Sequence, residues 1–70
     1  MKLNYHPDTD SLYIHLSPRP GADAQEIADD FVVDFDAEGN VVGIEVQHAS
    51  ERIDLTRIET SGLPTPARAG

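Results

Sequence analysis

The stretch from Phe31 to Ser50, FVVDFDAEGNVVGIEVQHAS, constrains the fold more than any other part of the chain. Its two runs Phe31–Phe35 and Val41–Val46 are rich in β-branched and aromatic residues, which fit a pleated and partly buried surface. The residues between them, DAEGN, fit a type I turn followed by Gly39 in the left-handed region. The stretch therefore predicts a central antiparallel hairpin.

A second hairpin is predicted at the start of the chain. Lys2–His6 and Ser11–Leu16 alternate apolar with polar residues, a pattern typical of strands that bury one face. Pro7 and the aspartates after it favour a turn, because proline presets φ and aspartate side chains accept hydrogen bonds from nearby N–H groups. These two strands are expected to pair with each other.

The segment between the two hairpins is less regular. Residues 17–24, SPRPGADA, contain two prolines and a glycine and are predicted to form a loop. Gln25–Ala28 is short, and we expect an edge strand there. Asp29 and Asp30 are expected to turn the chain into the central hairpin.

The hydrophobic period changes after Val46. Ala49 and Ile53 have the spacing of one side of a helix, and His48 or Ser50 is predicted to cap its first N–H groups.

These patterns predict the fold class α+β: a small, mainly antiparallel β-meander of 4–5 strands with one C-terminal helix packed on one face. The single domain spans residues 1–60. Within it, residues 54–59 are consistent with a continued helix or with a returning strand. Residues 61–70 contain two prolines and little to bury, and we expect a disordered tail.

The size of the chain limits its core. Seventy residues bury only about 60% of the surface that the unfolded chain exposes, and there is no cysteine to form a disulfide. We therefore favour burial of one face against another subunit as a source of stability, which implies a homodimer or a higher oligomer.

The chain is strongly acidic, with 13 Asp and Glu against five Lys and Arg and a net charge of −8. This charge repels phosphate backbones and anionic lipids, so we expect neither nucleic-acid nor membrane binding, and it suits a basic protein partner. No apolar run approaches the ~20 residues of a membrane span, and the first residues lack the apolar region of a signal peptide. We expect a cytoplasmic location.

The acidic residues around the central turn have nearly the spacing of an EF-hand calcium loop. Asp34, Asp36 and Glu38 precede Gly39, and Glu45 follows at the position of the last ligand. An EF-hand loop lies between helices, whereas both flanks here are predicted strands. Metal binding by Asp34, Asp36, Glu38 and Glu45 therefore stays an alternative, and no cofactor is predicted.

The second faces of the predicted strands suggest an interaction surface. Tyr13 and His15 on one strand, with Val32 and Val41 on the central hairpin, can form an apolar and aromatic patch rimmed by acids. A packed core face explains the same pattern equally well.

No serine lies in the sequence context of an activated nucleophile. One small sheet with one helix is also expected to leave little room for a ligand cavity of about 300 Å³ or more. We therefore expect no enzyme activity.

Three blocks of the sequence, YHPDTDSLYIHL, FVVDFDAEGNVVGIEVQHAS and ERI, resemble the small prokaryotic family called domain of unknown function 2283. The resemblance rests on a tyrosine, a Pro/Asp turn, D-x-L-Y-I, D-x-x-G-x-V-V-G-I-E and A-S, and covers about Leu3 to Ile53. It implies a compact sheet with one helix and supplies no catalytic residues. Some members look like companions of small toxin-like proteins, which implies an antitoxin or neutralising role.

The first hypothesis is therefore a non-catalytic protein-interaction module that self-associates and neutralises a basic, toxin-like partner. The alternatives are a divalent-metal-responsive module that uses the four acids, and, as the least favoured, a small enzyme.

Overall fold

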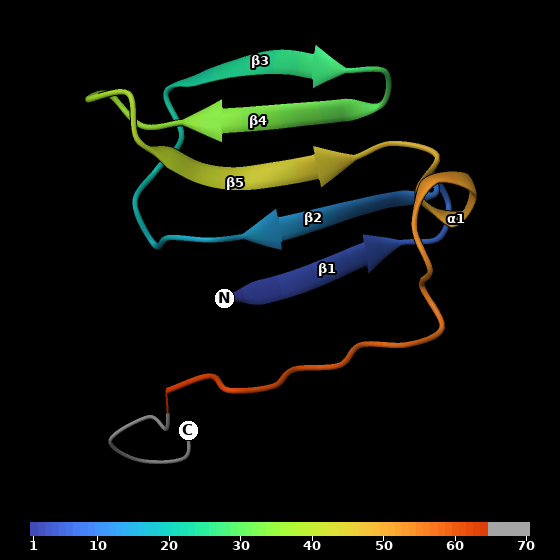
Figure 1. Ribbon diagram of the computed structural model, residues 1–70. Helices are drawn as coiled ribbons and strands as arrows, with labels where there is room; N and C mark the ends of the chain where they lie inside the picture. The colour runs from blue at the N-terminus through green and yellow to red at the C-terminus, as the bar shows by residue number, and fades with distance from the viewer. Residues whose placement is uncertain (65–70) are drawn as a thin grey trace.

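Within residues 1–64, which the computed structural model describes, five antiparallel strands form one open sheet (Figure 1). The spatial order of the strands is β1-β2-β5-β4-β3, so β1 and β3 are the two edges. One short helix, α1, follows the last strand. The elements are β1 (Lys2–His6), β2 (Ser11–His15), β3 (Asp23–Ala28), β4 (Phe31–Phe35), β5 (Val41–Val46) and α1 (Ala49–Arg52).

The antiparallel sheet and most strand positions are confirmed. The predicted ranges of β1, β4 and β5 coincide with the observed ones, and β3 is an edge strand that begins two residues earlier than expected, at Asp23. Gly39 has a φ of 88°, as the predicted hairpin turn requires.

The connectivity differs from a simple meander. After β2 the chain passes the ends of β5 and β4 and enters the sheet again at the far edge as β3 (Figure 1). β5 then returns to pair with β2, in the register Leu12↔Val46 and Ile14↔Ile44. β5 is therefore the central strand of the sheet, and its Val42 and Val46 are only 3% and 2% exposed.

Residues paired across antiparallel strands lie on the same face of a sheet, so the register divides the side chains into two faces. The apolar face includes the buried residues Leu12, Val33 and Val46. The polar face lies opposite. The apolar face also carries Leu3, Tyr5, Ile14, Phe31 and Ile44, and the polar face carries Asn4, Tyr13, His15, Glu26, Val32, Asp34 and Glu45.

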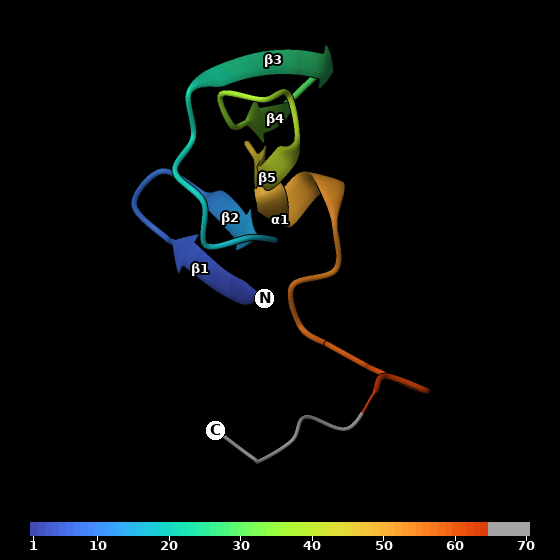
Figure 2. The same cartoon turned by 90° about the vertical axis from the view of Figure 1, so that its left-hand side faces the viewer.

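Helix α1 is too short to cover the apolar face of the sheet as a second layer. It has four residues, and its Ala49 is buried against Leu12 and Val46, with Ile53 and Leu55 packed beside them. Figure 2 shows the strands as a single layer, with α1 and the chain that follows it to one side. Much of the apolar face is therefore left without a second layer.

The segment after α1 is neither of the predicted alternatives. Residues 54–59 form no helix and no strand, and residues 61–64 are also irregular. The rest of the predicted tail, residues 65–70, lies outside the described residues. In the described part of the chain, no helix is long and apolar enough to cross a membrane.

Gly43 allows one side chain to cross the sheet on its polar face. The Tyr13 ring extends from β2 over Gly43 of β5, and its hydroxyl donates a hydrogen bond to Asp34 of β4. A Cβ atom at residue 43 would lie only 2.7 Å from Cζ of Tyr13 and 3.2 Å from the carbonyl oxygen of Ile14. A side chain at this position therefore displaces the tyrosine.

We predict that Gly43→Ala lowers the free energy of unfolding by about 1–3 kcal/mol, because it forces the Tyr13 ring away from Asp34. Urea unfolding measures the effect. Gly21→Ala is the matched control, since its Cβ would meet nothing closer than 3.9 Å. In a Tyr13→Phe background, which lacks the hydrogen bond, the cost of Gly43→Ala is expected to shrink. Equal losses for the two glycines would contradict this account.

Candidate functional site

A cluster of polar residues joins two turns of the sheet to the start of α1. Asp10 in the β1–β2 turn, Asp30 in the β3–β4 turn and His48 before α1 have φ values of 53°, 69° and 52°. Among the described residues they are the non-glycine residues with positive φ, a conformation that needs compensation from its surroundings. We call Asp10, Asp30, His48, Ser50 and Arg52 the clamp.

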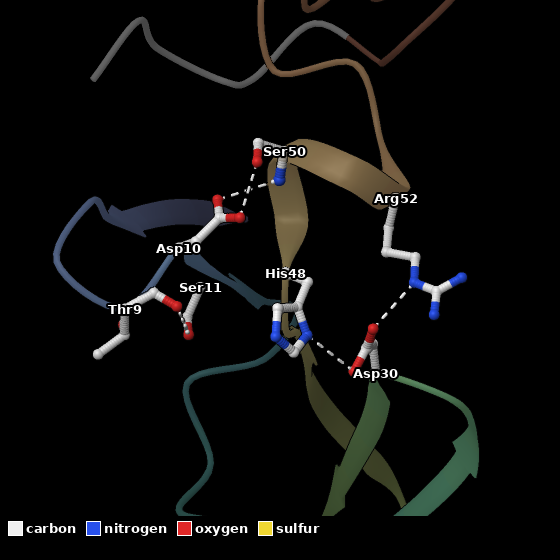
Figure 3. Close-up of polar contacts among 7 residues, drawn as sticks. All are labelled: Thr9, Asp10, Ser11, Asp30, His48, Ser50 and Arg52. Carbon is white, nitrogen blue, oxygen red and sulfur yellow. Dashed lines mark hydrogen bonds and ion pairs between the residues drawn. The ribbon is translucent and has the colours of Figure 1, made fainter.

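Asp10 supplies the cap of α1 (Figure 3). Its carboxylate accepts the Ser50 N–H at 3.0 Å and the Ser50 hydroxyl at 2.7 Å, and its backbone oxygen accepts the Ala49 N–H at 2.8 Å. The predicted cap by His48 or Ser50 is therefore wrong, since His48 is the N-cap residue but makes no side-chain cap. Hydrogen bonds from the Ser50 side chain, and then from the Tyr5 hydroxyl, hold the pKa of Asp10 below its usual range.

Asp30 holds the other side of the helix. Its carboxylate lies 2.9 Å from Nε of Arg52 and 3.1 Å from Nδ1 of His48, and both contacts are visible in Figure 3. Its backbone oxygen accepts the Gln47 N–H at 2.8 Å. Arg52, and then His48, lower the pKa of Asp30. The polar groups of the clamp thus bind one another, and its evident role is to orient the chain that leaves β5.

The polar face contains a second network. The pKa of Tyr13 is raised to about 12, first because Asp34 accepts its hydroxyl. The rings of Tyr13 and His15 meet edge to face with centroids 4.4 Å apart, and Nδ2 of Asn4 lies 3.2 Å from Nε2 of His15. Three of the four predicted interaction residues, Tyr13, His15 and Val32, share this face.

Val41 is the exception. A register shift between Asp34 and Phe35 pairs Val41 with Phe35, whereas Gly43 pairs with Asp34. Strict alternation places Val41 on the face of Val32, but the extra residue in β5 interrupts that alternation. Val41 is 42% exposed and lies apart from the other three.

The four acids of the calcium-loop pattern have separate surroundings. Asp36 is 5% exposed, and its carboxylate accepts the backbone N–H groups of Glu38 at 2.9 Å and Asn40 at 2.8 Å. The Asn40 N–H is the main cause of a lowered Asp36 pKa, and Nε of Arg19 lies 3.0 Å from the same carboxylate. Asp36 therefore organises its own turn.

The other three acids do not join Asp36. Asp34 accepts the Tyr13 hydroxyl, Glu45 lies on the polar face beside Tyr13 and Val32, and Glu38 is exposed in the turn. Over residues 1–64, no group of three or more His, Asp or Glu side chains is arranged to hold a metal ion. The predicted ligands thus do not form one site.

An apolar groove lies on the opposite side of the sheet. It encloses about 600 Å³ between β1 and β2 on one wall and the segment after α1 on the other. The expectation that the chain is too small for such a hollow is therefore wrong, because the irregular segment supplies the second wall. The lining residues are Leu3, Tyr5, Leu12, Ile14, Ile53, Asp54, Leu55, Arg57, Ile58 and Glu59.

Sequence reasoning missed the groove, and it also missed Asp10, Asp30 and Arg52 as partners of the helix. The sequence does show that Asp10 and Asp30 end two turns and that Ala49 and Ser50 begin the helix. Nothing in the sequence shows that these turns contact the helix.

Comparisons with known proteins agree with the resemblance seen in the motifs. A family model described as "Protein of unknown function (DUF2283)" matches residues 2–50. The chain is also similar to an uncharacterized protein of Methanocaldococcus jannaschii, MJ0789, with 31% identity over 61 residues that cover 84% of this chain and 50% of the relative. The chain thus spans about half the length of that curated relative. No solved structure matches the chain significantly.

We predict that acid destabilises the fold through Asp10 and Asp36. Both have a pKa lowered from 3.8, so their contributions to stability are complete above that unfolded value and are lost as the pH falls through the folded pKa. Urea midpoints measured between pH 7 and pH ~2 should fall in the acid range, and Asp36→Asn or Asp10→Asn should flatten that fall. Glu38→Gln, in the same turn, is the control and should keep the wild-type profile. An unchanged profile in both aspartate variants would exclude this role.

Proposed function

The chain belongs to the DUF2283 family of proteins of unknown function, and from that premise we propose that it is a non-catalytic protein-interaction module that self-associates through its apolar face. The family description names no activity, so the support comes from the architecture. The observation that carries the proposal is a single-layer sheet whose apolar face is open over β1 and β2.

The exposure of large apolar side chains explains why this face favours a partner. Leu3 and Tyr5 of the edge strand β1 are 43% and 42% exposed, and Ile58 across the groove is 74% exposed. Large apolar side chains that gather around one hollow favour association more than scattered exposed ones do. A small sheet also gains stability when a second layer covers its apolar face.

The state of the polar groups supports a non-catalytic role. The carboxylates of Asp10, Asp30, Asp34 and Asp36 all accept hydrogen bonds from neighbouring groups. In the described part of the chain, no buried side-chain nitrogen or oxygen lacks a hydrogen-bond partner. A catalytic acid, base or nucleophile has to be available to a substrate, so these networks favour a structural use.

A basic protein is the second candidate partner, and the charge distribution favours the polar face for it. Glu26, Asp34 and Glu45 lie there around Val32, and strands β3 to β5 contain no Lys or Arg. Opposite charges steer such partners together. Neutralisation of a basic, toxin-like partner would use this face. A metal-responsive role is less favoured, because the four predicted ligands do not come together.

We predict that the chain forms at least a dimer, seen by light scattering after size exclusion as a mass of two or more 7.6 kDa chains. Leu3→Lys should weaken the association about tenfold or more, because it introduces a charge into the apolar contact. Ile27→Lys is the matched control, since Ile27 is 63% exposed on the other edge strand, and it should associate like the wild type. A strict monomer at the highest soluble concentration would end the proposal.

For the second candidate, we predict that an oligolysine peptide binds the chain and that added salt weakens the binding, as expected for contact between exposed charges. Glu26→Gln with Glu45→Gln should reduce the affinity several-fold. The control variant, Asp8→Asn with Glu51→Gln, removes the same number of negative charges as the polar-face variant. It should therefore bind the peptide more tightly than Glu26→Gln with Glu45→Gln does. Equal affinities of the two double variants, measured by calorimetry, would show that only net charge matters.

A further inference from the structure

A further hollow, which we call the basic pocket, lies at the end of the sheet where β1 begins and β2 ends (Figure 1). It encloses about 370 Å³, and its polar lining residues are Lys2, His15, Ser17 and Arg19. None of the described residues that line it is Asp or Glu. The apolar groove, in contrast, contains Asp54 and Glu59, and a hollow beside β3 contains Asp23 and Asp34. The basic pocket thus has the opposite charge to that of the whole chain, which has 13 acids and five bases.

The two basic side chains of the pocket are those that the fold leaves without a hydrogen bond. In the described part of the chain, Arg52 and Arg57 each donate a hydrogen bond to a carboxylate. The side chains of Lys2 and Arg19 donate none to the described residues, although Nε of Arg19 lies 3.0 Å from the Asp36 carboxylate. The donors of one ammonium and one guanidinium are therefore available to a ligand at the same place.

The backbone places these groups around the pocket. Lys2 pairs with His15 in the register of β1 and β2, so the two side chains lie next to each other on the polar face. After β2, the Ser17 N–H donates to the Val42 oxygen at 3.2 Å, and the Arg19 N–H donates to the Ser17 hydroxyl oxygen at 3.3 Å. The pocket is thus formed by a strand pair and by a loop that is joined to β5.

Asp36 holds the Arg19 side chain in place. The ion pair involves Nε of Arg19, and the Asp36 carboxylate also accepts the N–H groups of Glu38 and Asn40 in its own turn. A guanidinium held at Nε keeps its terminal N–H groups, which form a planar fork that fits the oxygens of an anion. The Arg19 side chain is 55% exposed, so a ligand can reach it from solvent.

We propose that the basic pocket binds the phosphate group of a small organic phosphate monoester. A carboxylate has two oxygens, which the guanidinium fork alone can pair. A phosphate monoester has three terminal oxygens and a charge of about −1.5 to −2 at neutral pH, so it can pair with the Lys2 ammonium as well. The volume is near the lower end of the roughly 300–1,000 Å³ of ligand pockets, and Leu16 and Pro18 supply an apolar wall for the organic part.

The net charge of −8 selects the size of the ligand. At physiological ionic strength, exposed charges separated by more than about 8 Å are largely screened from each other. The two cations of the pocket therefore act on a small ligand more strongly than the distant acids do. A nucleic acid or an anionic membrane extends beyond the pocket onto the acidic surface, where it is repelled. The pocket thus favours a small phosphate ester and agrees with the expected lack of binding to polyanions.

Titration with phenyl phosphate at constant ionic strength, followed by nitrogen-15 NMR of the whole chain, tests the proposal. We expect saturable shifts of the amide signals of residues 15–19. Lys2→Gln and Arg19→Gln should each weaken the binding at least about fivefold, because each removes a cation that contacts the phosphate. Arg57→Gln is the matched control: it removes the same charge, but Arg57 lines the apolar groove, so this variant should bind like the wild type.

Two comparisons identify the chemistry of the contact. Benzoate, which has the same ring but a carboxylate, should bind several-fold more weakly than phenyl phosphate. Arg19→Lys keeps the charge but loses the fork, so its affinity should lie between those of Arg19→Gln and the wild type. Equal affinities for the two ligands would overturn the choice of phosphate.

The variants also separate a pocket from general attraction. Equal losses in Lys2→Gln, Arg19→Gln and Arg57→Gln would show that only net charge matters, and shifts that do not saturate would show adventitious binding. Either result overturns the proposal. Lys2→Gln decides the case if Arg19→Gln disturbs the turn of Asp36, because the Lys2 side chain donates no hydrogen bond that the described fold requires.

Discussion

Pairing of β5 with both β2 and β4 is the interaction on which the rest of the structure depends. The N-terminal hairpin and the β3–β4 hairpin have no strand contact except through β5. Val46 pairs with Leu12 on one side and with Phe31 on the other, and it is 2% exposed. The same strand leads directly into the clamp, where Asp10 and Asp30 hold the start of α1 from the two hairpin turns. Left-handed backbone at three residues costs about 1–3 kcal/mol each, and the clamp contacts offset that cost.

The sequence predicts local features of this fold well and remote ones poorly. Alternation in Phe31–Phe35 and Val41–Val46 depends only on neighbouring residues, so both strands were located correctly. The pairing of β2 with β5 joins strands that are separated in the chain by β3 and β4. The contact of Asp10 with Ser50 joins residues 40 positions apart. Neither follows from a local period. A helix at Ala49 was predicted, but its cap was not, because Asp10, which caps it, lies in another turn.

The site shows the same limit. Asp36 with Glu38 and Gly39 suggested a calcium loop because closely spaced oxygens also occur in hairpin turns, where a carboxylate accepts N–H groups from its own loop. Tyr13, His15 and Val32 were placed on one face correctly, whereas the extra residue in β5 moved Val41 away. The groove could not be predicted, since one wall is a segment without any hydrophobic period.

The two proposed contacts use opposite faces of one sheet, so they do not compete. Association through the apolar faces would leave both polar faces outward, each with Glu26, Asp34 and Glu45. The dimer would then double the negative charge available to a basic partner, whereas the groove of each copy contains only three charged residues, Asp54, Arg57 and Glu59. If the chain self-associates as proposed, the separation of apolar and acidic residues onto two faces would let a strongly acidic chain cover its apolar face.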